Sequence, residues 1–266
     1  MFANKHELLR AVRVYTYTNG PYFPYGPIGT WNVSNITDMS FLFAGCTTFN
    51  ESLAGWDVSH VTNMKGMFHE CHAFDQPLHM WDVSHVNNMQ AMFYGCYMFN
   101  QPVHTWNVAN VNNMKYMFGK CHTFDQPLEI WDVSRVVNMN GMFYDCCAFD
   151  QPLADWNVSH VVNMEGMFQG CHAFNQPLET WDVSHVDNMI RMFEGCHAFN
   201  QPLADWNVSI VCNIMYIFRD CPAFDQSLFA WTLKNTHIQA QQIKLFCNKD
   251  QQQHCLDPNW IDFLLK

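Results

Sequence analysis

Residues 56–80 read WDVSHVTNMKGMFHECHAFDQPLHM, and nearly the same 25 residues return along most of the chain. The tryptophan that opens this stretch recurs at an unbroken spacing of 25 residues. Its nine occurrences in this register are Trp31, Trp56, Trp81, Trp106, Trp131, Trp156, Trp181, Trp206 and Trp231. A unit of this length cannot bury its apolar side alone, so it stacks on its neighbours. The spacing therefore predicts a solenoid.

The repeats divide the chain into an array and two ends. With tryptophan as position 1, the unit reads W-[DN]-V-S-x-V-x-N-M-x-x-M-F-x-x-C-x-x-F-[DN]-Q-P-L-x-x, and eight full units fill residues 31–230. We expect residues 1–30 to form an N-terminal cap with a decayed half-repeat and a helix at His6 to Val14. Residues 231–266 are expected to form a partial ninth repeat and a C-terminal cap, in which Gln239 to Phe246 and Trp260 to Leu265 cover the last core face.

The apolar residues of each unit have helical spacing. Positions 6, 9, 13 and 16 are Val61, Met64, Phe68 and Cys71 in the quoted unit, which are three, four and three residues apart. This spacing paints one stripe on an α-helix. Serine at position 4, such as Ser59, has the place of a helix N-cap. We therefore expect a helix of about three turns over positions 5 to 15.

The remaining residues of each unit must return the chain to the next copy. Phenylalanine at position 19 and leucine at position 23 flank [DN]-Q-P, and proline cannot donate to a strand ladder. A short parallel strand is expected around positions 18 to 21. The fold class that follows is α/β, a leucine-rich-repeat-like solenoid. An all-β solenoid is the alternative, although the segment N-M-x-x-M-F has little β-branching.

The motif between Met67 and Met89, MFHECHAFDQPLHMWDVSHVNNM, recurs as far as Phe224. It closely resembles the BspA-like leucine-rich-repeat family, in particular the 25-residue branch known from mycoplasma-type bacterial surface proteins and large DNA viruses. The resemblance covers residues 31–233. It implies a scaffold that binds other proteins or cell surfaces, and it brings no catalytic residues to this chain.

Composition and charge restrict the partners and the compartment. The 266 residues are 49% hydrophobic and only 14% charged, with a net charge of −11 and no basic run, which disfavours nucleic acid. No apolar run approaches the roughly 18 residues that cross a bilayer. The opening residues MFANKHELLRAVR lack the apolar stretch of a secretory signal. We therefore expect a soluble intracellular protein or, for a viral product, one located in the virion or host cytoplasm.

Several residue types recur in register and are predicted to form structural ladders rather than chemical sites. Asparagine at position 8 and glutamine at position 21 are expected to pair backbone groups, and cysteine at position 16 to be a buried free thiol. Cys247 and Cys255 lie off the ladder and could pair only in an oxidising compartment. The ladder residues include Asn63, Asn88, Asn113, Cys46, Cys71, Cys96, Cys121, Cys146, Cys171, Cys196 and Cys221.

Histidines also fall into register, at positions 5 and 17. Pairs such as His60 with His85, or His172 with His197, should stand about one strand spacing apart. Such a pair could share a divalent metal, or repel when protonated below about pH 6.5. A zinc site usually needs three or four ligands, and a two-residue stack supplies two. We expect no metal and no cofactor, whereas a pH response stays open.

No nucleophile elbow, phosphate loop or zinc-ligand cysteine pair is present, and each residue that could look catalytic recurs as a copy. Catalysis needs one singular constellation of groups. We therefore expect that the protein is not an enzyme.

The positions that differ between units are the candidates for partner recognition. On the predicted helix, positions 7, 10, 11 and 14 face water. Tyrosines are enriched in interfaces, and the candidate partner-binding residues are Tyr94, Tyr116, Tyr144, Lys65, Lys115 and Glu165. The function expected is a non-enzymatic scaffold for protein–protein interaction. The alternative is a structural component that self-associates into a particle or surface layer.

Overall fold

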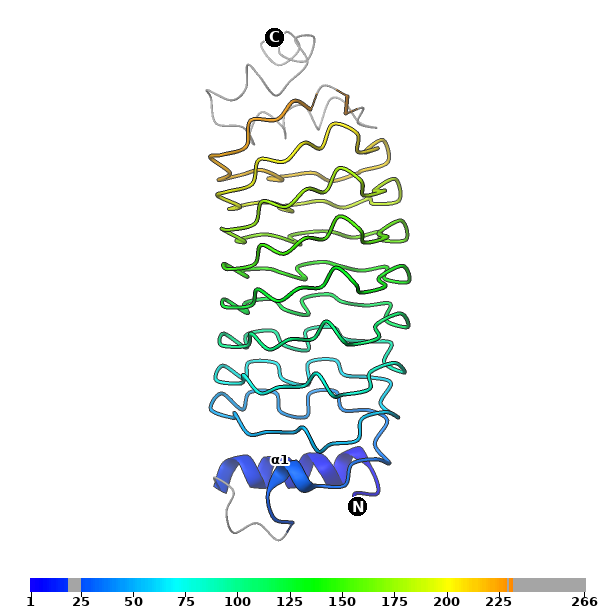
Figure 1. The fold of residues 1–266 in the computed structure, drawn as a ribbon, viewed down its shortest axis with the longest axis vertical. Helices are drawn as coiled ribbons and strands as arrows, with labels where there is room; N and C mark the ends of the chain where they lie inside the picture. Colours follow the sequence, from blue (N-terminus) through cyan, green and yellow to red (C-terminus); the bar gives the residue numbers. More distant parts are fainter. Residues whose placement is uncertain (19–24, 229, 232–266) are drawn as a thin grey trace.

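The computed structural model describes residues 1–18, 25–228 and 230–231. The chain begins with the α-helix α1 (Lys5–Thr18), which includes the predicted helix at His6 to Val14, and a 3-10 turn η1 (Ile28–Thr30). From there it forms 25-residue coils stacked along one axis, and α1 lies across the N-terminal end of the stack (Figure 1). The predicted C-terminal cap segments, Gln239 to Phe246 and Trp260 to Leu265, lie outside the described residues.

The expected helix-plus-strand unit is wrong. Within the described ranges α1 is the one α-helix, and no repeat contains a helix or an extended strand. Successive coils are instead joined at position 8 by isolated parallel bridges, from Asp38 with Asn63 to Asn188 with Asn213. The all-β alternative is not met either, because these bridges are single. None of the described helices has the length and apolar character needed to cross a bilayer.

Backbone hydrogen bonds explain why positions 9 to 16 do not form a helix. In the unit that starts at Trp56, every second N–H donates to the next coil, 24 residues ahead: Met64 to Asn88 at 2.9 Å, Gly66 to Gln90 at 2.8 Å, Phe68 to Met92 at 2.9 Å and Glu70 to Tyr94 at 2.6 Å. The N–H groups between them, on Met67, His69 and Cys71, donate to carbonyls three residues back at 2.9 to 3.1 Å. The Lys65 N–H donates to Asn63 Oδ1 at 3.1 Å. Every donor from position 9 to 16 is thus satisfied without a helical bond.

Left-handed backbone at two positions of each unit makes this pattern possible. Positions 11 and 15 have positive φ in all eight units, with nine non-glycine residues and seven glycines at these places. Such residues cannot continue a right-handed helix. The resulting four-residue turns bring positions 9, 12, 13 and 16 to the inside. Three of these, positions 9, 13 and 16, also belong to the stripe that an amphipathic helix would bury. Repeated glycines such as Gly66, Gly141 and Gly166 are the sequence signal of this geometry.

Aromatic ladders fill the core between the coils. The ring of Phe118 stacks on Phe143 of the next coil with centroids 5.9 Å apart, and on Phe124 of its own coil at 4.1 Å. The Trp131 Nε1 donates to the Val103 carbonyl at 3.1 Å, and the Cys121 Sγ donates to the Phe93 carbonyl at 3.1 Å. All of these side chains are buried. Each large side chain contributes about 1.5 to 3 kcal/mol, so stacking of like on like stabilises the array.

Polar side chains at positions 2, 8, 20 and 21 form hydrogen bonds that recur from coil to coil. Two of the predictions about them need revision. Asn63 at position 8 pairs a backbone N–H as predicted. Glutamine at position 21 donates mainly to a side chain: the Gln151 Nε2 lies 2.8 Å from Asp125 Oδ1, which also accepts the Asp150 N–H at 3.0 Å. The predicted serine N-cap is wrong, because no helix follows Ser59. Its N–H and Oγ instead donate to Asp57 Oδ1 at 3.1 and 2.6 Å.

The aspartates at position 2 make stability depend on pH. Hydrogen bonds from the serine hydroxyl and then its N–H lower the pKa of Asp57, Asp82, Asp132 and Asp182. A lowered pKa stabilises the fold above the unfolded-state value of about 3.9, and this contribution is lost as pH falls through the folded-state pKa. We predict that replacing all four aspartates by asparagine reduces the change in the urea denaturation midpoint between pH 5 and pH 3. Asn157 and Asn207 already make this turn, so an unchanged slope would contradict the assignment.

The cysteine ladder predicts a clear order of thiol reactivity. Burial raises the pKa of Cys121 and its ladder neighbours, whereas Cys212 is exposed. A protonated, buried thiol is a poor nucleophile. In a Cys247→Ser/Cys255→Ser background, Ellman's reagent should modify Cys212 quickly and the ladder only after unfolding in guanidinium. Fast reaction of several thiols in the native Cys212→Ser variant would contradict the structure.

Candidate interaction face

Positions 10, 11, 14 and 15 of the eight units form one surface, which we call the variable face. Their side chains differ from coil to coil, and most of them are half-buried. Since positions 10 and 11 and positions 14 and 15 are the outward residues of the two left-handed turns, each coil presents four of them. Position 15 was missed by the helix-based prediction, which placed positions 7, 10, 11 and 14 on the surface.

Five of the six predicted partner-binding residues line one surface cavity of about 570 Å³. Its lining comprises Phe41, Lys65, His69, Gln90, Ala91, Tyr94, Lys115, Tyr116 and Tyr144. All of these residues come from positions 10, 11 and 14 of successive coils. Glu165 is not part of the lining, and its Oε2 accepts from Asn188 Nδ2 at 3.0 Å.

Three tyrosines form the aromatic part of the cavity. The ring of Tyr116 meets Tyr94 edge to face with centroids 5.8 Å apart, and it meets Tyr144 in the same way at 6.2 Å. Edge-to-face pairs of this kind are worth about 0.5 to 1.5 kcal/mol beyond area burial. Burial is the main cause that raises the pKa of Tyr116 and of Tyr144. Their hydroxyls are therefore neutral, and that of Tyr144 is hydrogen-bonded to the Asp145 side chain.

Lysines lie over aromatic rings of the variable face. The Nζ of Lys115 is 5.4 Å from the Tyr116 centroid, that of Lys120 is 5.6 Å from Tyr94, and that of Lys65 is 5.8 Å from Phe41. Each distance is in the cation–π range. The pKa of Lys120 is raised, first by the Coulomb interaction of its ammonium group with the phenol oxygen of Tyr94 and also by a hydrogen bond to that oxygen. These contacts hold the ammonium groups in place at the surface.

Glycines of the next coil make room for the aromatic rings. A Cβ added at Gly66 would lie 2.5 Å from Phe41 Cε1, and one added at Gly119 would lie 2.8 Å from Tyr94 Cδ2. A Cβ at Gly141 would likewise overlap the Tyr116 ring. Tyr116 itself has φ 54, a left-handed conformation that costs about 1 kcal/mol or more outside glycine. Tyr116 thus has an aromatic side chain at a position where glycine would adopt the backbone conformation at a lower energy.

A second cluster occupies the variable face near the C-terminal end of the described coils. Arg191 and Arg219 both lie over the Tyr216 ring, at 5.5 and 5.3 Å from its centroid. Each guanidinium also contacts Glu194 at 3.4 Å. Arg191 and Tyr216 at position 11 are not among the predicted partner-binding residues, because their left-handed backbone cannot be read from the helical pattern.

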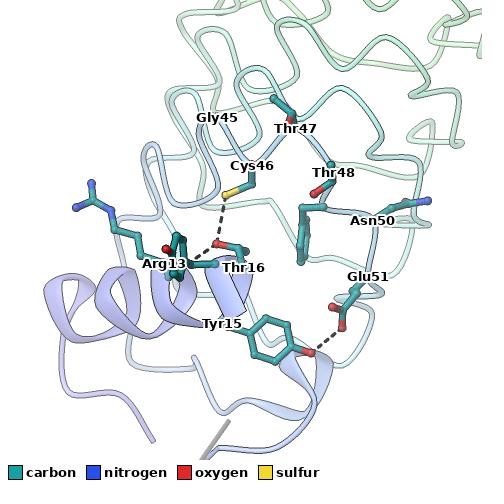
Figure 2. Close-up of a pocket in the computed structure, with 11 residues that line it drawn as sticks. Arg13, Tyr15, Thr16, Gly45, Cys46, Thr47, Thr48, Asn50 and Glu51 are labelled. Carbon is teal, nitrogen blue, oxygen red and sulfur yellow. Dashed lines mark hydrogen bonds between the residues drawn. The ribbon is translucent and has the colours of Figure 1, made fainter. Parts of the chain in front are cut away.

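A cavity of about 580 Å³ lies where α1 meets the first coils (Figure 2). The Tyr15 hydroxyl donates to Glu51 Oε2 at 2.7 Å, and the Cys46 Sγ lies 3.7 Å from Thr16 Oγ1. Burial raises the pKa of the Cys46 thiol, so it stays protonated and is a poor nucleophile. These contacts join the helix to the stack. They offer no pair of nucleophile and base.

The histidines at position 17 stack on rings of neighbouring coils, whereas no such stacking joins the histidines at position 5 in the described coils. The rings of His172 and His197 are parallel with centroids 4.4 Å apart, and Tyr97 lies between His72 and His122 at 4.4 and 4.8 Å. Histidines at position 5 such as His60 are exposed, with Nδ1 3.2 Å from the preceding serine Oγ. In the part of the chain that the structure describes, no three histidine, cysteine or acidic side chains gather as metal ligands.

Comparison with known proteins relates the chain to one family. The model of the family described as "Mycoplasma protein of unknown function, DUF285" matches residues 14–124, 76–166 and 153–255. These overlapping matches span most of the chain, as expected for tandem repeats. No curated protein and no solved structure gave a match.

The packing of Tyr116 on Gly141 gives a testable prediction. Gly141→Ala should destabilise the protein by about 1 to 3 kcal/mol more than Gly45→Ala, because the added methyl group overpacks against the Tyr116 ring. Gly45 is the control, since it also has positive φ but has open space around it. In a Tyr116→Ala background, urea denaturation should show that Gly141→Ala costs no more than Gly45→Ala, because the ring that the methyl group would meet is absent. Equal effects of the two glycine variants with Tyr116 in place would show that the ring lies elsewhere.

Proposed function

The chain belongs to the DUF285 family of Mycoplasma proteins of unknown function, and on this premise we propose that it is a non-enzymatic scaffold that binds a partner protein through the variable face. The observation that carries the proposal is the cavity shared by Lys65, Tyr94, Lys115, Tyr116 and Tyr144. Tyrosine and half-buried aromatic anchors in a formed pocket are features of binding hot spots.

The rigidity of the face supports binding. In the coils that start at Trp31 to Trp181, each variable residue lies on a turn whose backbone donors are all satisfied, half of them by the adjacent coil. Side chains on such a frame lose little conformational freedom when a partner docks, which improves affinity. The cation–π contacts add to this, because they fix lysine side chains that would otherwise be mobile.

The chemistry of the repeated residues supports a role without catalysis. The ladder cysteines are buried thiols whose pKa is raised by burial, as for Cys96 and Cys146. Each ladder cysteine recurs in the same environment in successive coils, whereas catalysis needs one singular arrangement. Ten free cysteines among the described residues also favour a reducing compartment, inside a cell or in a host cytoplasm.

The repeat motif's resemblance to the BspA-like family favours the same class of function. It concerns the motif alone, because the repeats within residues 31–228 contain neither the helix nor the strand of a leucine-rich repeat. A structural component of a particle or surface layer, which could be viral, is the alternative that the experiment below separates from a scaffold.

Photo-cross-linking tests the proposal. A benzoylphenylalanine at Tyr94 or Tyr144 should cross-link one defined protein in an extract of the native source, whereas the same group at Ile130, which is 68% exposed, should not. The captured protein is then purified and its affinity measured. Tyr94→Ala/Tyr144→Ala should weaken binding roughly 30-fold, the effect of losing about 2 kcal/mol.

The matched control is His79→Ala/Glu129→Ala, which changes exposed residues away from the variable face and should alter affinity less than twofold. Equal binding by the tyrosine variant would contradict the proposal. Mass photometry of the chain alone tests the alternative, since ordered multi-copy assemblies growing with concentration would favour a structural component.

A further inference from the structure

The basic residues of the repeats are gathered on one face. Residues 31–231 contain six lysines and arginines, and all except Arg135 lie on the variable face: Lys65, Lys115, Lys120, Arg191 and Arg219. The chain as a whole carries a net charge of −11. The cavity formed by Lys65, Tyr94, Lys115, Tyr116 and Tyr144 is lined by two lysines and one histidine and by no carboxylate. Two acidic groups outside the lining act on its tyrosines, Glu165 on Tyr116 and Asp145 on Tyr144. An acidic occupant therefore complements this cavity.

The lysines of the cavity are available for such an occupant. Among the described residues neither Lys65 nor Lys115 makes an ion pair, whereas Arg191 and Arg219 are both engaged by Glu194. The nearby carboxylate of Glu70 contacts His72 Nε2 at 2.7 Å. Lys65 and Lys115 thus have no ion-pair partner among the described residues, whereas Arg191 and Arg219 share Glu194.

Backbone hydrogen bonding restricts the conformation of the occupant. In the coils that start at Trp31 to Trp181, all N–H donors from position 9 to 16 are used within the stack, so the part of the face around the cavity has no free edge to which a strand could add. A polyproline II segment needs no backbone partner, and it docks into grooves lined by aromatic rings. Tyr94, Tyr116 and Tyr144 provide such rings with their edges and hydroxyls at the cavity.

The spacing of the lysines sets the spacing of the acidic residues. Lys65 and Lys115 occupy position 10 two coils apart, which is about 10 Å if parallel backbones lie about 4.8 Å apart. A polyproline II helix has three residues per turn and a rise of 3.1 Å, so side chains at i and i+3 share one face about 9 Å apart. An extended strand would bring i and i+2 together at about 7 Å.

We propose that this cavity binds an acidic polyproline II segment of a partner protein, with carboxylates three residues apart paired to Lys65 and Lys115. Prolines or other apolar side chains between the two carboxylates pack against the tyrosines. The inference rests on the proposed scaffold function, because it names the chemistry of the partner that the variable face would recognise.

Synthetic peptides test the inference on the full chain by fluorescence polarisation. The labelled peptide PPEPPEPP should bind at least tenfold more tightly than PPEPEPPP, in which the glutamates are two residues apart, and than PPKPPKPP. Lys65→Glu/Lys115→Glu should reduce binding of the first peptide at least tenfold. Arg135→Glu removes a repeat cation outside the variable face and should leave binding within twofold.

The charge-reversed variant also provides a measurement in which binding is gained rather than lost. Lys65→Glu/Lys115→Glu should gain binding of PPKPPKPP, which a misfolded variant would not do. Equal binding of the two acidic peptides, or equal loss with Arg135→Glu, would overturn the inference in favour of unspecific charge attraction. Preference for dextran sulfate over both acidic peptides would overturn it in favour of a polysaccharide. Partner capture at Tyr94 with no response to any acidic peptide would contradict this inference and leave the scaffold function intact.

Discussion

The structure depends on backbone N–H groups at positions 9 to 16 of each coil that donate alternately to the next coil and within their own coil. For example, the Phe68 N–H donates to the Met92 carbonyl of the next coil, and the His69 N–H donates to the Gly66 carbonyl of its own coil. The left-handed residues at positions 11 and 15 are required for this alternation. Stability then comes from pairing each coil with the next, which is why like residues stack into ladders of phenylalanine, tryptophan, cysteine and asparagine. An array of this kind behaves as a nearly one-dimensional system of neighbouring interfaces.

The same alternation creates the variable face. Because the inward residues at positions 9, 12, 13 and 16 are fixed by the core, positions 10, 11, 14 and 15 are the places where coils differ without loss of stacking. Tyr116 illustrates the cost and the use of this arrangement, since it holds an aromatic ring in a left-handed conformation over Gly141. Strained residues of this type gather at functional sites.

Much of the organisation could be predicted from the sequence, and the local backbone could not. Burial of Trp56, Met64, Phe68 and Cys71 follows from the repeat, and helical register was enough to place Tyr94, Tyr116 and Tyr144 on one side. The helix itself was wrong, because the turns of each coil bury positions 6, 9, 13 and 16, the same three-four-three spacing that an amphipathic helix would bury. Glycine recurring at positions 11 and 15 is the sequence signal that distinguishes these turns from a helix. The signal is weak, because nine of the residues at those positions are not glycine. Charge pairing across coils, as between Arg219 and Glu194, needs the stacking geometry and cannot be read from one unit.

Scalar couplings across hydrogen bonds test the central claim most directly. In a deuterated, isotopically labelled sample, NMR should detect coupling from the amide nitrogen of Phe68 to the carbonyl carbon of Met92, and from Phe118 to Met142, each 24 residues ahead. Couplings from these nitrogens to carbonyls four residues back would instead show that the repeats are helical, and would contradict the stacked-coil account.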